Sequence, residues 1–224
     1  MSINLLKLFE NATIRNIIRN ISVNGGKITF KKLHNALNIS QSTLEYYLDR
    51  LVKKGLIVRE SRGLIRLKRL TPYCFIFGVK SSINYIGLLG MRNDRAIPEP
   101  IVAHNLLSKE KYDVVRLIVY TSTEALNSWK EFFHNNFYNK LYWRILSLKI
   151  LNNFDEMTKI FRKDLATLDN HIIIADCTSG PRPSGIALYK VSEENNIPLI
   201  YIPENERRII WLISREDLRK KFNL

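Results

Sequence analysis

The sequence has little cysteine, few acidic residues for its number of basic ones, and no long apolar run. Cys74 and Cys177 are its only cysteines and lie far apart, so we expect free buried thiols in a reducing cytoplasm rather than a disulfide framework. No apolar run reaches the ~18 residues that a membrane-spanning helix needs. Residues 1–16 carry charges and no cleavage-type segment. The sequence therefore predicts a cytoplasmic protein with no membrane partner.

Signatures of common catalytic and metal sites are also missing. The histidines are scattered, and no cysteine or carboxylate stands at metal-ligand spacing from them, which argues against a metal site. The sequence contains no nucleophile elbow, and no P-loop lysine follows a glycine pair. The glycines at 87 and 90 do not form a dinucleotide fingerprint. We therefore expect no cofactor.

Acidic residues are scarcest in the first third of the chain. Residues 1–72 hold 14 Lys and Arg against 4 Asp and Glu, whereas residues 73–224 hold 21 against 17. The formal net charge of +14 is thus concentrated at one end. A solvated surface or a lysine-rich composition could produce such an excess, but its concentration on one segment favours binding to nucleic acid.

This basic segment contains the pattern of a DNA recognition helix followed by a hairpin. Ser40 is a good N-cap, and Gly55 ends the helix where a left-handed residue is wanted. After Gly55, the apolar and charged residues 56–60 and 64–68 flank Ser61-Arg62-Gly63, which predicts a hairpin of two strands and a turn. Its basic side chains, available to phosphates, are Arg59, Arg62, Arg66 and Lys68. One helix face should be buried, because apolar residues recur at helical spacing. These are Leu44, Tyr47, Leu48, Leu51 and Val52.

The segment upstream completes a known arrangement. Apolar residues between 5 and 21 predict one long helix or two short ones, and Thr29 caps a further short helix. The order of helix, short helix, turn, recognition helix and wing over residues ~5–70 resembles the winged helix-turn-helix family. The resemblance implies double-stranded DNA as the partner.

The resemblance also implies which side chains contact DNA. Gln41 could read an adenine and Glu45 a cytosine in the major groove, while basic side chains bind phosphates. Alternatively, Glu45 and Asp49 only keep this helix face soluble, and Thr43 faces the core or the turn. The expected DNA-binding residues are Gln41, Ser42, Thr43, Glu45, Tyr46, Arg50, Lys53, Lys54, Arg59 and Arg62.

Beyond residue 83, short β-branched runs alternate with amphipathic helices. Strands are predicted at 84–90, 114–120, 145–151, 171–177, 198–202 and 208–213. Helices are predicted at about 97–107, 123–136, 154–168 and 183–195. This alternation is typical of a parallel, Rossmann-like sheet, with the last two strands forming an edge hairpin.

The fold class is therefore α/β: an N-terminal winged helix-turn-helix followed by a Rossmann-like, mostly parallel six-stranded sheet. We expect the winged helix at 1–70, a linker at 71–83 and the Rossmann-like domain at 84–224. A short closing helix should begin near residues 214–217.

Three strand ends of this sheet carry glycine, hydroxyl and arginine residues. Ligands of open parallel sheets bind beyond the carboxyl ends of the strands, where small residues let a phosphate or ribose approach backbone amides. Arg92 and Arg182 supply forked donors, whereas the hydroxyls at 121–123 could equally be helix caps. The expected ligand-binding residues are Gly90, Met91, Arg92, Asn93, Thr121, Ser122, Asp176, Thr178, Ser179, Gly180, Pro181 and Arg182.

The segment IIIADCTSGPRP at 172–183 resembles the D-x-T-G-G-x-K/R signature of CARF domains, the CRISPR-associated Rossmann folds. The resemblance covers residues ~84–213. It implies a homodimer that binds a cyclic oligoadenylate across its two-fold axis through these loops. Archaeal CRISPR-associated transcriptional regulators join a CARF domain to a winged helix-turn-helix. Here the order of the two domains is reversed, and Ser179 replaces the first glycine of the signature.

Together, the two resemblances imply a transcriptional regulator of a CRISPR-type antiviral defence system, controlled by a cyclic oligoadenylate, with cyclic tetra-adenylate as the expected ligand. One alternative is a ring nuclease that cleaves this ligand weakly, with Arg182 as the candidate catalytic residue through charge stabilisation. Another is an assembly module whose winged helix binds protein. Residues 176–185 could also be only a polar turn before a helix.

Overall fold

The computed structural model forms two compact units, which we treat separately. Unit 1 comprises Met1–Lys80 and Arg215–Leu224, and unit 2 comprises Ser81–Ser214. The structure describes residues 5–79, 82–92, 96–133, 140–168, 170–204 and 208–224. No helix within these ranges is long and apolar enough to cross a membrane.

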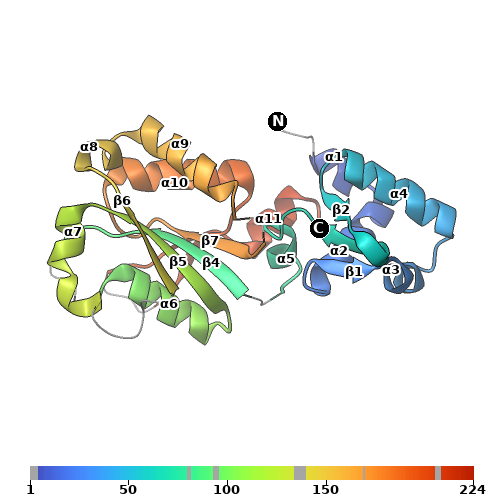
Figure 1. Ribbon diagram of the computed structural model, residues 1–224, viewed down its shortest axis with the longest axis horizontal. Helices are drawn as coiled ribbons and strands as arrows, with labels where there is room; N and C mark the ends of the chain where they lie inside the picture. Colours follow the sequence, from blue (N-terminus) through green and yellow to red (C-terminus); the bar gives the residue numbers. More distant parts are fainter. Residues whose placement is uncertain (1–4, 80–81, 93–95, 134–139, 169, 205–207) are drawn as a thin grey trace. The chain divides into compact units, whose positions relative to one another are not determined.

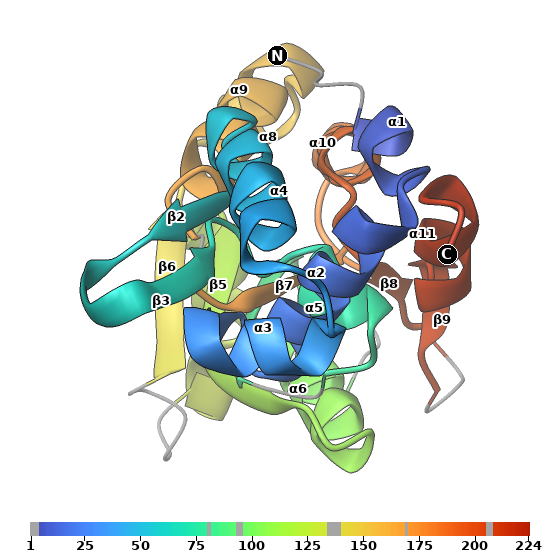
Figure 2. The same ribbon diagram turned by 90° about the vertical axis from the view of Figure 1, so that its right-hand side faces the viewer.

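Unit 1 is the predicted winged helix-turn-helix, with one strand more than the sequence predicts. Its three-stranded antiparallel sheet has the order β1-β3-β2, and the β2–β3 hairpin extends beside α4 (Figure 2). The additional strand is β1, which pairs with β3. The elements are α1 (Leu5–Phe9), α2 (Ala12–Val23), β1 (Lys27–Thr29), α3 (Phe30–Leu37), α4 (Gln41–Lys53), β2 (Ile57–Arg59), the 3₁₀ helix η1 (Ser61–Gly63), β3 (Leu64–Leu67), α5 (Tyr73–Ile76) and α11 (Arg215–Lys221).

Helix α4 begins and ends where the sequence predicts. The Ser40 side chain accepts a hydrogen bond from the Thr43 amide at 3.1 Å, and Gly55 has a φ of 68° just beyond the helix. Leu44 is fully buried, as are Leu48 and Leu51. The prediction for Val52 is wrong, because its side chain is 38% exposed. Eight residues beyond Leu44 at about 100° per residue, it lies about 80° round the helix, at the edge of the buried face.

Two segments that the sequence analysis places outside the winged helix fold with unit 1. The sequence predicts a linker at 71–83, yet α5 lies there and is buried. It also predicts that the closing helix belongs to the Rossmann-like domain, yet α11 packs on α5. Phe222 explains this position, because its ring lies 5.1 Å from that of Phe9 and 6.2 Å from that of Tyr73. Aromatic packing thus fixes the end of the chain in unit 1.

Unit 2 contains the predicted six-stranded, mostly parallel sheet. The strand order is β6-β5-β4-β7-β8-β9, and β9 is antiparallel to β8. Helices α8, α9 and α10 lie on one side of the sheet and α6 on the other (Figure 1). The elements are β4 (Ser82–Leu88), α6 (Glu99–Lys109), β5 (Asp113–Thr121), α7 (Thr123–Ser128), the 3₁₀ helix η2 (Lys130–Phe133), β6 (Leu141–Ile145), α8 (Leu148–Leu151), α9 (Phe154–Leu165), β7 (Ile172–Asp176), α10 (Arg182–Asn195), β8 (Leu199–Tyr201) and β9 (Ile210–Ile213).

The strand predicted at 145–151 is wrong. The strand is β6, which ends at Ile145, and α8 follows it. The Ser147 side chain caps α8 by accepting from the Ile150 amide at 3.4 Å, so the apolar residues after it form a helical turn. The helix predicted at 123–136 is also divided into α7 and η2, and residues 134–139 lie outside the described ranges.

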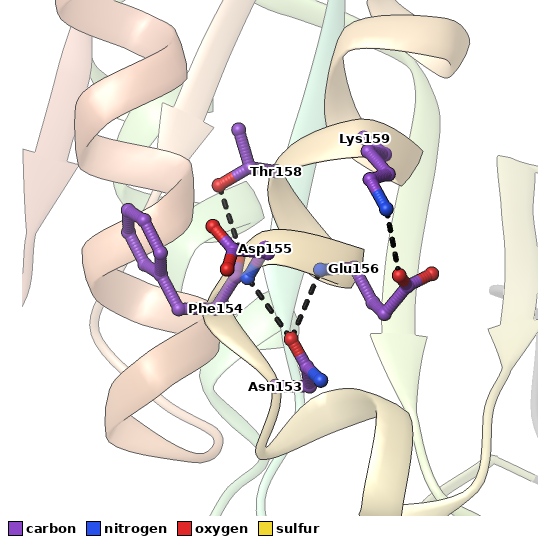
Figure 3. A network of polar contacts seen from close by, with 6 residues as sticks. All are labelled: Asn153, Phe154, Asp155, Glu156, Thr158 and Lys159. Atoms are coloured by element: carbon purple, nitrogen blue, oxygen red, sulfur yellow. Dashed lines mark hydrogen bonds and ion pairs between the residues drawn. The ribbon is translucent and has the colours of Figure 1, made fainter.

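Capping also explains why α9 begins directly after α8. The Asn153 side chain accepts hydrogen bonds from the amides of Asp155 at 3.0 Å and Glu156 at 3.1 Å (Figure 3). The two carboxylates lie in the first turn of the helix, where the macrodipole favours negative charge. Lys159 then pairs with Glu156 at 2.9 Å. These local contacts stabilise the start of the helix that the sequence predicts at 154–168.

Candidate functional sites

Two loops, which we call the strand-end loops, follow adjacent parallel strands. Residues 89–92 follow β4, and residues 177–181 follow β7. The strand order reverses between these strands, since the chain proceeds from β4 outward to β5 and β6, and from β7 outward to β8. Ligands bind at such a switch point in open α/β sheets. The Gly90 amide donates to Ser179 Oγ at 2.9 Å, so the structure brings the two loops together.

The glycines of these loops allow the close approach. Gly180 has a φ of 84°, and a Cβ atom there would lie 2.8 Å from the Cβ of Leu88. A Cβ at Gly90 would lie 3.1 Å from the amide nitrogen of Gly180. Ser179, which departs from the CARF signature, provides the hydroxyl that joins the loops. Glycine is therefore required here for both backbone conformation and space.

Asp176 and Thr178 support the β7 loop with their side chains. Asp176 is 1% exposed, and its carboxylate accepts from the Tyr85 hydroxyl at 2.8 Å and from the Thr178 amide at 2.8 Å. The Thr178 hydroxyl donates to the same carboxylate and accepts from the Ile202 amide at 2.8 Å. Both side chains, expected to bind ligand, are thus engaged within the protein and position the loop.

Two supporting residues are not predicted from the sequence. Tyr85 reaches Asp176 because its ring lies over Gly87, where a Cβ would be 2.2 Å from the Tyr85 hydroxyl. Trp129 is 1% exposed and donates from Nε1 to the Gly90 carbonyl at 2.9 Å. A glycine two residues after a tyrosine in an apolar strand is the signal that could have identified the first of these.

Burial makes the carboxyl of Asp176 a weaker acid than usual. Desolvation raises the pKa of its carboxyl from 3.8 to about 6, against the opposing effect of the hydrogen bonds from Thr178 and Tyr85. Since this pKa lies above the unfolded value of about 3.9, folding favours the protonated form. The resulting contribution to stability is fully present below about pH 4 and is lost as the pH rises through about 6.

We expect Asp176→Asn to remove this pH dependence. Two pKa units correspond to about 3 kcal/mol, so between about pH 4 and pH 7 the wild type should lose up to that much unfolding free energy relative to the variant. Urea unfolding of both proteins at several pH values measures the difference. If the two unfolding free energies differ by the same amount at every pH, the pKa of Asp176 is not raised.

Arg92 lies against an aromatic pair. Its guanidinium carbon is 5.6 Å from the Trp129 ring centroid and 5.0 Å from that of Phe132, and Nη1 is 3.7 Å from a carboxylate oxygen of Glu131. Its backbone amide donates to Ser128 at 2.9 Å. Cation–π and ion-pair contacts therefore hold this charge close to the β4 loop.

The remaining predicted residues divide into supports and exposed groups. Thr121 is buried and donates to the Leu89 carbonyl at 3.0 Å, and Ser122 caps α7, which agrees with the helix-cap alternative. Met91 is 52% exposed. Asn93 lies outside the described residues.

Arg182 begins α10 and is exposed. Among the residues that the structure describes, its side chain has no hydrogen-bond or ion-pair partner. Pro181 is the N-cap and provides no side-chain bond to the first amides of the helix. An exposed guanidinium at the start of a helix can bind an anion such as a phosphodiester.

Other reactive groups near the loops are weak candidates for chemistry. Cys177 is a free thiol whose pKa burial raises to about 12, so it stays protonated at neutral pH. Within the described part of the chain, no three His, Cys, Asp or Glu residues are placed to hold a metal ion.

The predicted DNA-binding residues lie on one helix and its wing. All are exposed except Glu45, which is partly buried. Thr43 lies in the capping network, with its hydroxyl 2.8 Å from that of Ser40. Four cations have no side-chain hydrogen bond or ion pair with any described residue. They are Arg50, Lys53, Lys54 and Arg62.

Arg59 differs from these cations. Its Nη1 lies 2.8 Å from Glu45 Oε2, and its Nη2 lies 3.1 Å from Asp49 Oδ1. It also donates to the Glu45 carbonyl at 3.3 Å. The wing is therefore bonded to the recognition helix through one guanidinium.

Comparison with known proteins supports the fold of unit 1. Residues 10–58 match the family model described as winged helix-turn-helix DNA-binding. No curated protein matches the sequence significantly.

Three solved structures are similar at low identity. Can2 from Sulfobacillus thermosulfidooxidans, in complex with cyclic tetra-adenylate, is 18% identical, with 58% of this chain and 34% of that chain covered and a TM-score of 0.43. VC1899 from Vibrio cholerae is 12% identical, with 59% and 34% covered and a TM-score of 0.43. Csm6 from Enterococcus italicus, bound to cyclic hexa-2′-fluoro-hexa-dAMP, is 12% identical, with 64% and 38% covered and a TM-score of 0.44. The chain spans little more than a third of these proteins.

Proposed function

We propose that the protein is a homodimeric DNA-binding regulator that senses a cyclic oligoadenylate. Binding of the ligand to unit 2 is the input, and binding of unit 1 to DNA is the output. The match of residues 10–58 to a DNA-binding winged helix carries this proposal. The concentration of basic residues in the same segment supports it, because neutralising phosphates supplies most of the affinity for DNA. A CRISPR-type antiviral defence system, of the archaeal kind, is its proposed setting.

The strand-end loops support the ligand half of the proposal. They meet at the switch point of the sheet, and Arg182, an exposed cation, follows the β7 loop at the start of α10. These groups suit the phosphodiesters of cyclic tetra-adenylate. In a dimer, two winged helices would bind half-sites about 34 Å apart, and a ligand would change that spacing by binding one arrangement more tightly.

Calorimetric titration with cyclic tetra-adenylate and cyclic hexa-adenylate tests the input. We expect one of the rings to bind and Arg182→Ala to weaken it about 10- to 100-fold, because a hydrogen bond to a charged group contributes about 1.5–3 kcal/mol. Arg116→Ala is the matched control. Arg116 lies on β5 opposite Asn84 in the strand register, near the start of β4, whereas the strand-end loops follow the other end of that strand. Failure of both rings to bind would refute the proposed input.

A ring nuclease is the second candidate, on the observation that Arg182 is exposed and has no side-chain partner among the described residues. A ribose 2′-hydroxyl would lose its proton and attack the neighbouring phosphorus, and the bond from phosphorus to the 5′ oxygen would break. The 5′ oxygen would take up a proton from water, and Arg182 would stabilise the charge on the phosphate oxygens. Incubation with cyclic tetra-adenylate would then give linear products that Arg182→Ala does not give.

A further inference from the structure

Two acidic side chains lie on the recognition helix, the proposed DNA-binding surface. Of the four acidic residues among residues 1–72, Glu45 and Asp49 lie on α4, four residues apart. Like charges at this spacing repel each other on a helix, and both would repel phosphates. A cation close to both carboxylates would reduce this repulsion.

Arg59 is that cation. It contacts both carboxylates, at 2.8 Å and 3.1 Å, and its fork also reaches the Glu45 carbonyl. The forked guanidinium binds two oxygens in one plane, whereas a lysine is a point charge. Engaged in this way, Arg59 is less available to phosphate than Arg62, which has no partner among the described residues.

The pairing also fixes the orientation of Glu45. Arg59 binds Oε2, and no described residue bonds to the Oε1 atom. A carboxylate oxygen in the major groove accepts a hydrogen bond from the N4 amino group of cytosine. The ion pair thus leaves one acceptor of Glu45 in a defined position.

We propose that Arg59 is a positioning residue of the DNA-binding surface, which neutralises Glu45 and Asp49 and orients Glu45 toward a cytosine. The inference rests on the proposed DNA-binding function. It assigns Arg59 a role different from a phosphate contact, and it gives the preferred duplex a C·G pair that Glu45 reads.

A double-mutant cycle tests the inference by fluorescence anisotropy on a duplex that the wild type selects from a randomised pool. Introduced alone, Arg59→Ala should weaken DNA binding about tenfold. Added to the Glu45→Gln, Asp49→Asn variant, it should weaken binding less than about threefold, because no carboxylates then remain for Arg59 to neutralise. Arg62→Ala, the control, should cost the same in both backgrounds and lower the salt slope by about 0.9. Arg59→Lys should recover part of the affinity.

Several outcomes would overturn the inference. An equal cost of Arg59→Ala in both backgrounds, with a reduced salt slope, would make Arg59 a phosphate contact. A wild-type selection without a preferred cytosine, or one that Glu45→Gln leaves unchanged, would remove the specificity role. If the wild type binds no duplex at all, the proposed function fails, and the inference fails with it.

Discussion

Gly180→Ala should abolish measurable binding of cyclic tetra-adenylate. Gly180 has a φ of 84°, a conformation that costs a residue with a Cβ about 1–2 kcal/mol. The new Cβ would also lie 2.8 Å from the Cβ of Leu88, which is 1% exposed and cannot move aside freely. Overpacking of this kind costs about 1–3 kcal/mol. The loop must therefore shift away from Gly90, and chemical denaturation should show a loss of about 2–5 kcal/mol.

Gly185→Ala is the matched control for this variant. Gly185 lies within α10, and a Cβ there would meet only the Cys177 carbonyl at an ordinary 3.7 Å. Alanine in a helix is about 0.5–1 kcal/mol more favourable than glycine. We expect full ligand affinity and a slight gain in stability. If Gly180→Ala binds the ligand as the wild type does, the strand-end loops are not the binding site.

Lys53→Glu combined with Arg62→Glu should weaken DNA binding about 100-fold or more. Both side chains are exposed and have no partner among the described residues, so they are available to phosphates. Each reversal removes one released counterion and adds repulsion, and the slope of log affinity against log salt should fall by about 2. Anisotropy titrations at several salt concentrations measure both quantities.

A double reversal with the same charge change provides the control. Lys149 and Lys163 are exposed lysines of unit 2 without partners among the described residues. Their replacement by glutamate should change DNA affinity less than about threefold at 0.1 M salt, because neither residue belongs to the winged helix and salt screens exposed charges. Wild-type DNA affinity in the Lys53→Glu, Arg62→Glu variant would instead favour the assembly module, in which the winged helix binds protein.

Local signals explain which elements the sequence predicts. Ser40 and Gly55 define α4 because capping acts within a few residues. Strand β1 is missed because its three residues gain their stability from β3, more than thirty residues later. The segment at 145–151 fits both a strand and a helix, and the cap at Ser147 decides between them.

The location of the ligand-binding loops is predictable, whereas the roles of their side chains are not. Parallel strands bring their carboxyl ends to one edge of the sheet. A parallel sheet predicted from the sequence therefore places the strand-end loops at the same edge. Asp176 accepts from the hydroxyl of Tyr85, 91 residues earlier, and Arg59 contacts Glu45 across 14 residues. Pairings over such separations depend on packing that no local pattern encodes. For this reason several residues expected to contact ligand or phosphate are engaged inside the protein.

Control of DNA binding by the ligand can be measured by titrating a labelled duplex from upstream of the protein's own gene, with and without saturating cyclic tetra-adenylate. We predict binding in both cases, with dissociation constants that differ at least about fivefold, the lower end of typical allosteric coupling. By linkage, the duplex should change the affinity for the ligand by the same factor. Identical dissociation constants, in a protein that binds the duplex and the ligand separately, would contradict a ligand-controlled regulator.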